Sequence, residues 1–319
     1  MKAEECNSYL CLVHADCPDG TAAAWVFREW VLTQHLNGMG VAFQIVPVTY
    51  NNPPPEITAP VHLVILDFTY DVDTTRQLID HPNVVSFTLL DHHPRAWEIR
   101  KTVLSWVDTA KAGGGMRGLV DKPILALHEE YQSGAMMAWN HFFPKKPVPD
   151  LIAHVSDRDL WQFDLPDTRN FMDGLRSYAL NLDTWDEVFK EHSPYTGALK
   201  EHLLTQAPAF QRMQEAEINE VINSTKRIVV FKHVVGALEI QLTFPIINCR
   251  RTIMPEALMR LCDESPSVAA SYHDTAEYRI ISLRSKIVDI RWVAEFFGGG
   301  GHPHACSFRV PRSHPIAQL

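Results

Sequence analysis

The chain lacks any apolar run that approaches the ~20 residues needed to cross a bilayer. Its first residues, MKAEECNSYL, also lack a basic segment followed by a long apolar one, which is the pattern of a secretory signal. These two absences predict a cytoplasmic protein with no membrane partner.

Cysteine is scarce, and its spacing is not that of a metal or disulfide framework. Six cysteines occur among 319 residues, and none forms a C-x-x-C pair. This spacing argues against a zinc ribbon and against a disulfide-stapled domain. We expect reduced thiols that mostly pack in the interior.

Basic residues are too few to balance the acidic ones, and the formal net charge is −9. The imbalance lies in residues 1–225, at −13, whereas residues 226–319 carry 12 Lys and Arg against 8 Asp and Glu, or +4. Nonspecific binding of long nucleic acid needs a basic surface. The charge therefore argues against a long duplex as partner and leaves a short anionic ligand held at one local site.

What is present is the composition of an ordinary globular protein, 46% apolar and 21% charged, with enough length for two cores. Apolar runs at 9–13, 43–48, 61–68 and 84–93 predict strands, and helical spacing at 21–36 and 71–79 predicts helices between them. Strands that are apolar on both faces and alternate with helices predict an α/β fold, with a parallel sheet covered on both sides.

The predicted secondary structure changes twice along the rest of the chain. Residues 110–122 predict a flexible glycine-rich loop, and helices are expected at 129–143 and 150–163. We predict three parts: a parallel-sheet α/β domain at 1–165, a mainly helical connector at 166–225, and a smaller α/β domain at 226–319. The last part has strand-like pieces at 227–235, 238–248, 267–273 and 278–285, a helix at 288–297, and then GGGGHPHACSFRV.

Acidic and histidine side chains follow several of the predicted strands and helices. They are His14, Asp16, Asp19, Asp67, Asp91, His92, His93, Asp157 and Asp159. In parallel sheets ligands bind outside the carboxyl ends of the strands, so these groups are expected to converge. Imidazole and carboxylate ligands suit Mn²⁺, with Mg²⁺, Co²⁺ or Fe²⁺ as competitors. Two ions about 3.5 to 4 Å apart would suit the cleavage of phosphate esters. Each residue alone also fits a cap or turn, and only the ordered set carries the signal.

Two features of the last part suit the binding of phosphate or a base. The run GGGG at 298–301 would let backbone N–H groups approach a ligand closely, although it also fits a simple turn. Arg284 would supply a bidentate phosphate contact, although an exposed strand arginine without a role fits equally.

The segments HADCPDG, Asp67, LLDHHP, SDRDLW and GGGGHPHAC, in this order, resemble the DHH phosphoesterase superfamily with its DHH-associated C-terminal domain. The resemblance spans residues 9–310. It implies that His14, Asp19, Asp67, His92 and one acid of SDRD bind two metal ions, with Asp67 bridging them.

The resemblance also implies roles for the remaining candidates. Asp91 would orient or ligate beside His92, and His93 would lie nearer the scissile phosphate. The residues expected to hold the far end of the substrate are Arg284, Ser285, Gly299, Gly300, Gly301 and His302.

This sequence departs from the family pattern in three places. Cys17 and Pro18 separate Asp16 from Asp19, and Cys17 takes the place of a usual aspartate, so that either Asp16 compensates or one metal site is weaker. Asp157 and Asp159 both fit the fourth motif, of which we prefer Asp159. ACS replaces the more usual AAG near the end.

We therefore expect a manganese-dependent phosphodiesterase that hydrolyses short single-stranded oligonucleotides or linear dinucleotides to mononucleotides, similar to the nanoRNases of this superfamily. Three alternatives stay open: a cyclic-dinucleotide phosphodiesterase, a polyphosphate or pyrophosphate hydrolase, and a catalytically weak nucleotide sensor. The sequence is also compatible with a homodimer.

Overall fold

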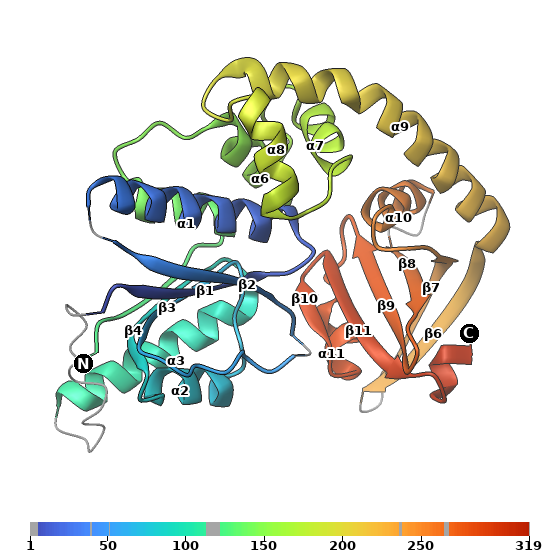
Figure 1. Cartoon of the computed structure of the whole chain (residues 1–319). Helices are drawn as coiled ribbons and strands as arrows, with labels where there is room; N and C mark the ends of the chain where they lie inside the picture. The colour runs from blue at the N-terminus through green and yellow to red at the C-terminus, as the bar shows by residue number, and fades with distance from the viewer. Residues whose placement is uncertain are drawn as a thin grey trace. The chain divides into compact units, whose positions relative to one another are not determined.

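A five-stranded parallel sheet forms the centre of residues 1–210 in the computed structural model (Figure 1). The structure describes residues 6–38, 40–50, 52–112, 122–235, 238–264 and 268–318, so most of the predicted loop 110–122 lies outside the described residues. The strands are β1 (Ser8–His14), β2 (Ala42–Val48), β3 (Val61–Leu66), β4 (Val84–Asp91) and β5 (Ile124–His128). They lie in the order β2-β1-β3-β4-β5, which confirms the parallel sheet predicted from the apolar runs.

Alternate residues of the central strands point to opposite faces of this sheet, and helices cover both. Cys11 and Leu66 belong to the core that contains α1 (Pro18–Leu36) and α5 (Gly134–Phe142). Leu12 and Ile65 face the core that contains α2 (Val72–Asp80) and α3 (Pro94–Lys111). The period of two in the sequence therefore becomes two separate cores, one on each side of a shared sheet.

Four further helices follow the sheet. They are α6 (Asp150–Asp159), α7 (Thr168–Arg176), α8 (Leu182–Glu191) and α9 (Gly197–Thr225). Helix α6 ends at Asp159 instead of continuing to 163, because Trp161 and Phe163 have left-handed backbones, with φ of 57° and 56°. The predicted connector 166–225 contains α7, α8 and α9, and the chain divides into two compact units between Phe210 and Gln211, inside α9. Among the helices in the described part of the chain, none is long and apolar enough to span a bilayer.

A six-stranded mixed sheet forms the second unit, residues 211–319, in the order β10-β11-β9-β8-β7-β6. Its strands are β6 (Arg227–Val235), β7 (Leu238–Asn248), β8 (Val268–Asp274), β9 (Tyr278–Ser285), β10 (Gly300–His302) and β11 (Ala305–Pro311). Helix α10 (Met254–Asp263) packs in one core, and α11 (Arg291–Phe296) packs in the other. Helix α10 is absent from the sequence prediction, as is strand β5.

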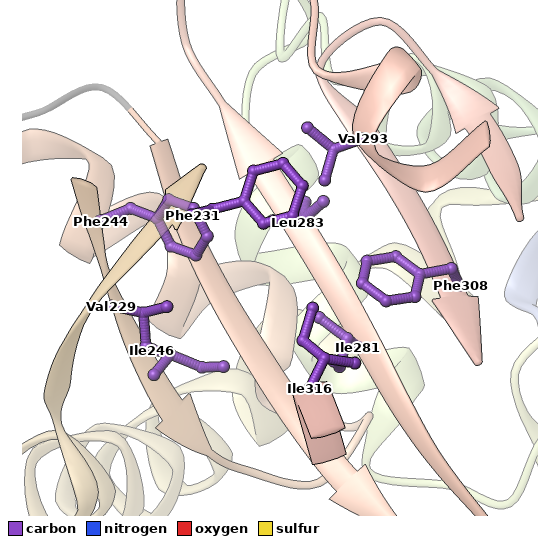
Figure 2. Close-up of a pocket in the computed structure, with 9 residues that line it drawn as sticks. All are labelled: Val229, Phe231, Phe244, Ile246, Ile281, Leu283, Val293, Phe308 and Ile316. Carbon is purple, nitrogen blue, oxygen red and sulfur yellow. The ribbon is translucent and has the colours of Figure 1, made fainter. Parts of the chain in front are cut away.

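A pocket lies on the α11 side of this second sheet (Figure 2). Phe231, Phe244 and Phe308 come from the strands, and Val293 comes from α11. The nine residues that line it are all apolar, so the pocket offers nothing to bind phosphate or a metal ion. The candidate functional site lies instead at the carboxyl edge of the first sheet.

Candidate metal centre at the edge of the parallel sheet

Three neighbouring strands end in ionisable side chains. His14 ends β1, Asp67 follows β3, and Asp91 ends β4. The connection from β1 to β2 runs through α1 on one face, whereas β3 and β4 are joined by α2 on the other face. The ends of β1 and β3 therefore flank a topological switch point, where open α/β sheets bind their ligands.

Asp67 is the central group of this edge. Its side chain is 1% exposed, and its carboxylate lies 3.5 Å from Nδ1 of His14 and 3.3 Å from Nε2 of His92. Neither contact has hydrogen-bond geometry, and both oxygens of Asp67 are buried without a hydrogen-bond partner among the described residues. The backbone of Asp67 is left-handed, with φ of 54°. Such a backbone costs roughly 1–3 kcal/mol, and burying a charge costs several more, which packing alone does not offset.

A second group of ligand atoms meets at His92. Its Nε2 lies 3.8 Å from Oδ2 of Asp19 and 3.4 Å from Oδ2 of Asp159. The first turn of α5 binds the carboxylate of Asp19. The backbone N–H groups of Gly134 and Ala135 donate hydrogen bonds to its two oxygens at 2.6 and 3.0 Å. The amino end of a helix attracts a carboxylate, so the first turn of α5 holds Asp19 in position.

Asp91 holds His93. Its Oδ1 accepts hydrogen bonds from Nδ1 and the backbone N–H of His93, at 2.7 and 3.2 Å, and its Oδ2 accepts one from the hydroxyl of Thr69 at 2.5 Å. Burial lowers the pKa of His93, but Asp91 outweighs this effect and raises it to about 9. Likewise, burial opposes the protonation of His92, while Asp67, Asp159 and Asp19 raise its pKa to about 10. Asp91 is thus occupied with positioning His93 through Nδ1 of its ring.

The residues present fit a centre for two divalent ions. Donor atoms lie within 4.8 Å of one another in three groups: Asp19, His92 and Asp159; His14, Cys17 and Asp67; and Asp67, Asp91, His92 and His93. Burial, with the carboxylates of Asp67 and Asp159, raises the pKa of Asp19, as expected where like charges crowd together. A divalent ion would relieve this repulsion and would satisfy the buried oxygens of Asp67.

Two of the predicted ligands are placed differently from the rest. Asp16 is exposed and has a left-handed backbone, with φ of 53°, and it belongs to none of the three groups. Asp157 is buried, and its oxygens accept hydrogen bonds from the backbone N–H groups of Asp164 and Leu165 and from the hydroxyl of Thr168. The structure therefore brings Asp159 to the cluster and uses Asp157 to fold the loop that follows α6.

Two glycines allow the cluster to close. A Cβ at Gly134 would lie 2.4 Å from Cβ of Asp67, and a Cβ at Gly20 would lie 2.2 Å from the carbonyl oxygen of His14. Both positions therefore require glycine for close approach and not for an unusual backbone. Gly20 belongs to a motif noted in the sequence, whereas the role of Gly134 has no local signal.

Tyr50, which lies beside His14, and Arg95, which lies beside Tyr50, were not foreseen from the sequence. The ring of Tyr50, which is 47% exposed, lies 5.6 Å from the ring of His14 and stacks on Phe68. The guanidinium of Arg95, exposed in the first turn of α3, lies 5.9 Å from the Tyr50 ring. An exposed ring and a cation beside the cluster are groups that could contact a base and a phosphate.

In the second unit, strand pairing brings Arg284 and His302 onto one face. Ala305 in β11 pairs with Arg284 in β9 and with His302 in β10. Directly paired residues of antiparallel strands share a face, so the two side chains are separated by two strand spacings, roughly 9–10 Å. Gly300 and Gly301 lie in β10, and the hydroxyl oxygen of Ser285 accepts hydrogen bonds from the backbone of the following turn.

Comparisons with known proteins support the fold. No family model matches the sequence. A curated protein, uncharacterized protein R106 of Acanthamoeba polyphaga mimivirus, is 23% identical over 311 residues, which are 92% of this chain. The chain spans 65% of that relative's length.

Among solved structures, the DHH domain of a member of the s1p family of ribosomal proteins is similar, with a TM-score of 0.60 and 15% identity. The match covers 98% of this chain and 85% of that one. The pGpG-specific phosphodiesterase PggH from Vibrio cholerae matches at a TM-score of 0.42, with 12% identity, over 98% of this chain and 96% of that one. The likeness to the DHH domain confirms the fold predicted from the sequence motifs.

Proposed function

We propose that this chain, which has the fold of the DHH phosphoesterases, binds two divalent metal ions and hydrolyses phosphodiester bonds. The observation that carries the proposal is Asp67, a buried carboxylate set between His14 and His92, whose two oxygens have no hydrogen-bond partner among the described residues. We propose Mn²⁺ as the ion, with Mg²⁺ or Co²⁺ as substitutes, because imidazole and carboxylate donors suit these ions.

The metal ligands would be His14 and Asp67 at one position, and Asp19, Asp67, His92 and Asp159 at the other. Bound ions of this kind activate water and neutralise phosphate charge. The protein's part is to hold these ligands rigidly, and the first turn of α5 does so for Asp19. Asp67, fixed by its buried position and left-handed backbone, would bind both ions.

His93 would act on the phosphate itself. Its Nδ1 is held by Asp91, so Nε2 is the nitrogen that can meet a phosphate oxygen or the leaving oxygen. In its protonated form His93 would stabilise negative charge on the phosphate and donate a proton as the bond breaks. Asp91 keeps the ring in this orientation and favours the protonated form.

For the substrate we propose a short single-stranded oligonucleotide or a linear dinucleotide, cleaved to mononucleotides. Arg95 and Tyr50 offer a cation and an exposed ring near the cluster, and Arg284 and His302 offer a second polar surface on the other unit. Pyrophosphate would need no such additional surface, whereas a second nucleotide would. We also propose that a long duplex is not a substrate, since residues 1–225 carry a net charge of −13.

A hydrolysis panel with Mn²⁺ tests this proposal. The full chain is given linear dinucleotides, a five-nucleotide RNA, cyclic dinucleotides and polyphosphate, beside His92→Ala and a matched control, His35→Ala, in which the substituted histidine is exposed at the end of α1. We expect rapid cleavage of the linear species by the wild type and by His35→Ala, and loss of cleavage in His92→Ala.

Other outcomes would separate the alternatives. Preferred cleavage of a cyclic dinucleotide or of polyphosphate would keep the metal centre and replace the substrate. Nucleotide binding without turnover in Mn²⁺, Mg²⁺ or Co²⁺ would contradict a hydrolase and support a nucleotide sensor.

A further inference from the structure

Cys17 lies where a metal ligand would lie. Three ligand atoms come within 4.8 Å of one another here: Sγ of Cys17, one ring nitrogen of His14 and one carboxylate oxygen of Asp67. Three ligands at Zn–S and Zn–N distances around one tetrahedral ion are roughly 3.4–3.7 Å apart. The carboxylate of Asp67 already lies 3.5 Å from Nδ1 of His14, so an ion fits after small side-chain movements.

Helix capping does not account for this cysteine. Cys17 is the N-cap of α1, with an extended backbone, and its side chain makes no capping hydrogen bond of normal geometry. Burial and the carboxylates of Asp67, Asp159 and Asp19 raise the pKa of its thiol, and the nearby backbone N–H of Gly20 only partly opposes this rise. Ser, Thr, Asp or Asn would normally occupy this position and accept a bond from the first turn. Its carbonyl oxygen accepts the bonds from Thr21, which any residue at this position could do.

The side chains of Asp67 and His14 give an independent reason to expect a ligand at this position. Both oxygens of Asp67 and Nδ1 of His14 are buried without a hydrogen-bond partner among the described residues. A packed thiol, which is a weak donor, would leave these atoms unsatisfied, at a cost of about 1–3 kcal/mol each. A metal ion shared by the three side chains satisfies them all.

We propose that Cys17 ligates, through its thiolate sulfur, the ion held by His14 and Asp67, so that the two metal positions differ in kind. The inference rests on the proposed metal centre and deepens it. The position with Cys17 has nitrogen, oxygen and sulfur donors, whereas the position with Asp19, His92 and Asp159 has nitrogen and oxygen only. Sulfur favours Zn²⁺, Co²⁺ or Fe²⁺, and oxygen-rich ligands favour Mn²⁺ or Mg²⁺.

This assignment gives the centre a mixed-metal character. On coordination the thiol proton leaves to solvent, and the thiolate sulfur becomes the ligand. Mn²⁺ or Mg²⁺ would fill the oxygen-rich position readily and the Cys17 position weakly. The purified full chain is expected to retain a thiophilic ion at the Cys17 position.

Cobalt spectroscopy tests the ligand directly. Metal-free full-length protein is titrated with Co²⁺, and thiolate ligation produces a sulfur-to-cobalt charge-transfer band in the near ultraviolet. We expect this band in the wild type, its loss in Cys17→Ser and Cys17→Asp, and its retention in Cys249→Ala, a buried cysteine of the second unit. Cys17→Ser should also weaken Co²⁺ binding at one position by on the order of 10- to 100-fold or more.

A second measurement needs no variant. X-ray absorption at the zinc edge of the Zn²⁺-loaded wild type should show a sulfur neighbour at about 2.3 Å beside nitrogen and oxygen neighbours. A wild type that hydrolyses phosphodiesters and binds two Co²⁺ ions without the band or the sulfur neighbour overturns the role of Cys17 alone. A band that persists in Cys17→Ser overturns it as well. A chain that binds no Co²⁺ overturns both this inference and the proposed metal centre.

Discussion

The two sheets of this chain differ in how deeply they bury the polar side chains that we assign to function. At the edge of the first sheet, Asp19, Asp67 and Asp91 are all buried, and Asp67 has a left-handed backbone. In the described part of the second unit, positive φ occurs only at glycines, and Arg284 and His302 are partly exposed on regular strands. Buried carboxylates are thus gathered where we place the chemistry, whereas the second unit presents Arg284 and His302 without burying them.

The largest expected effect concerns the buried cluster at the edge of the first sheet. His92→Ala removes the imidazole around which Asp67, Asp19 and Asp159 gather. We expect phosphodiester hydrolysis to fall on the order of 10³- to 10⁴-fold, as for loss of a central group in other hydrolases. Initial rates at saturating Mn²⁺ measure this loss, and a variant within tenfold of the wild type would place the chemistry elsewhere.

The next prediction concerns the pH dependence that Asp91 imposes. Asp91 raises the pKa of His93 to about 9, so the ring is protonated below this pH and loses its proton above it. Asp91→Asn removes the anion and lowers the pKa, so the alkaline limb of the pH–rate profile should move to lower pH. At pH 8 the rate should fall by roughly 10²-fold, the scale of general acid catalysis. An alkaline limb that does not move would show that His93 is not the acid.

A methyl group tests how tightly the centre is built. Gly134→Ala places a Cβ 2.4 Å from Cβ of Asp67. Alanine favours the helix by about 0.5–1 kcal/mol, but overpacking costs about 1–3 kcal/mol, so the net effect is destabilising. A displaced Asp67 should lower activity by about 10²-fold.

The matched control is Gly197→Ala at the first residue of α9, where an added Cβ meets nothing within 4 Å. It should leave activity unchanged. Urea unfolding and initial rates measure both variants, and equal behaviour of the two would contradict the close contact between Gly134 and Asp67.

The smallest effect is expected on the second unit. Arg284→Ala should lower kcat/KM for a linear dinucleotide by about 10- to 100-fold, the value of a charge-assisted hydrogen bond. Hydrolysis of bis(p-nitrophenyl) phosphate, which lacks a second nucleotide, should stay within twofold. Arg309→Ala, in which the exposed Arg309 of β11 is removed, is the matched control. Equal losses on both substrates would show that Arg284 supports the fold and not recognition.

Local sequence signals predict much of this structure. Apolar runs identify β1, β3 and β4, and the acids and histidines after them meet because the strands are parallel and adjacent. Strand β5 is only five residues long and carries little signal. Helix α10 was missed although Pro255 stands in its first turn, which is a recognised start signal.

Long-range contacts are what the sequence could not predict. The hydrogen bond from the backbone N–H of Gly134 to the carboxylate of Asp19 joins residues that are 115 positions apart. The choice between Asp157 and Asp159 also depended on folding, because helix α6 ends at Asp159 and its last turn sends the two side chains to different partners. Cys17 was visible as a departure from the motif, but its distance to His14 and Asp67 was not.

The central claim is that Asp67 binds two ions at once, and metal stoichiometry tests it most directly. Asparagine tolerates a left-handed backbone, so Asp67→Asn removes a charge without changing φ. Calorimetric titration with Mn²⁺ or Co²⁺ should show two ions bound to the wild type and much weaker binding of both to Asp67→Asn. A wild type that binds at most one ion, or a variant that binds two as tightly, would contradict the account.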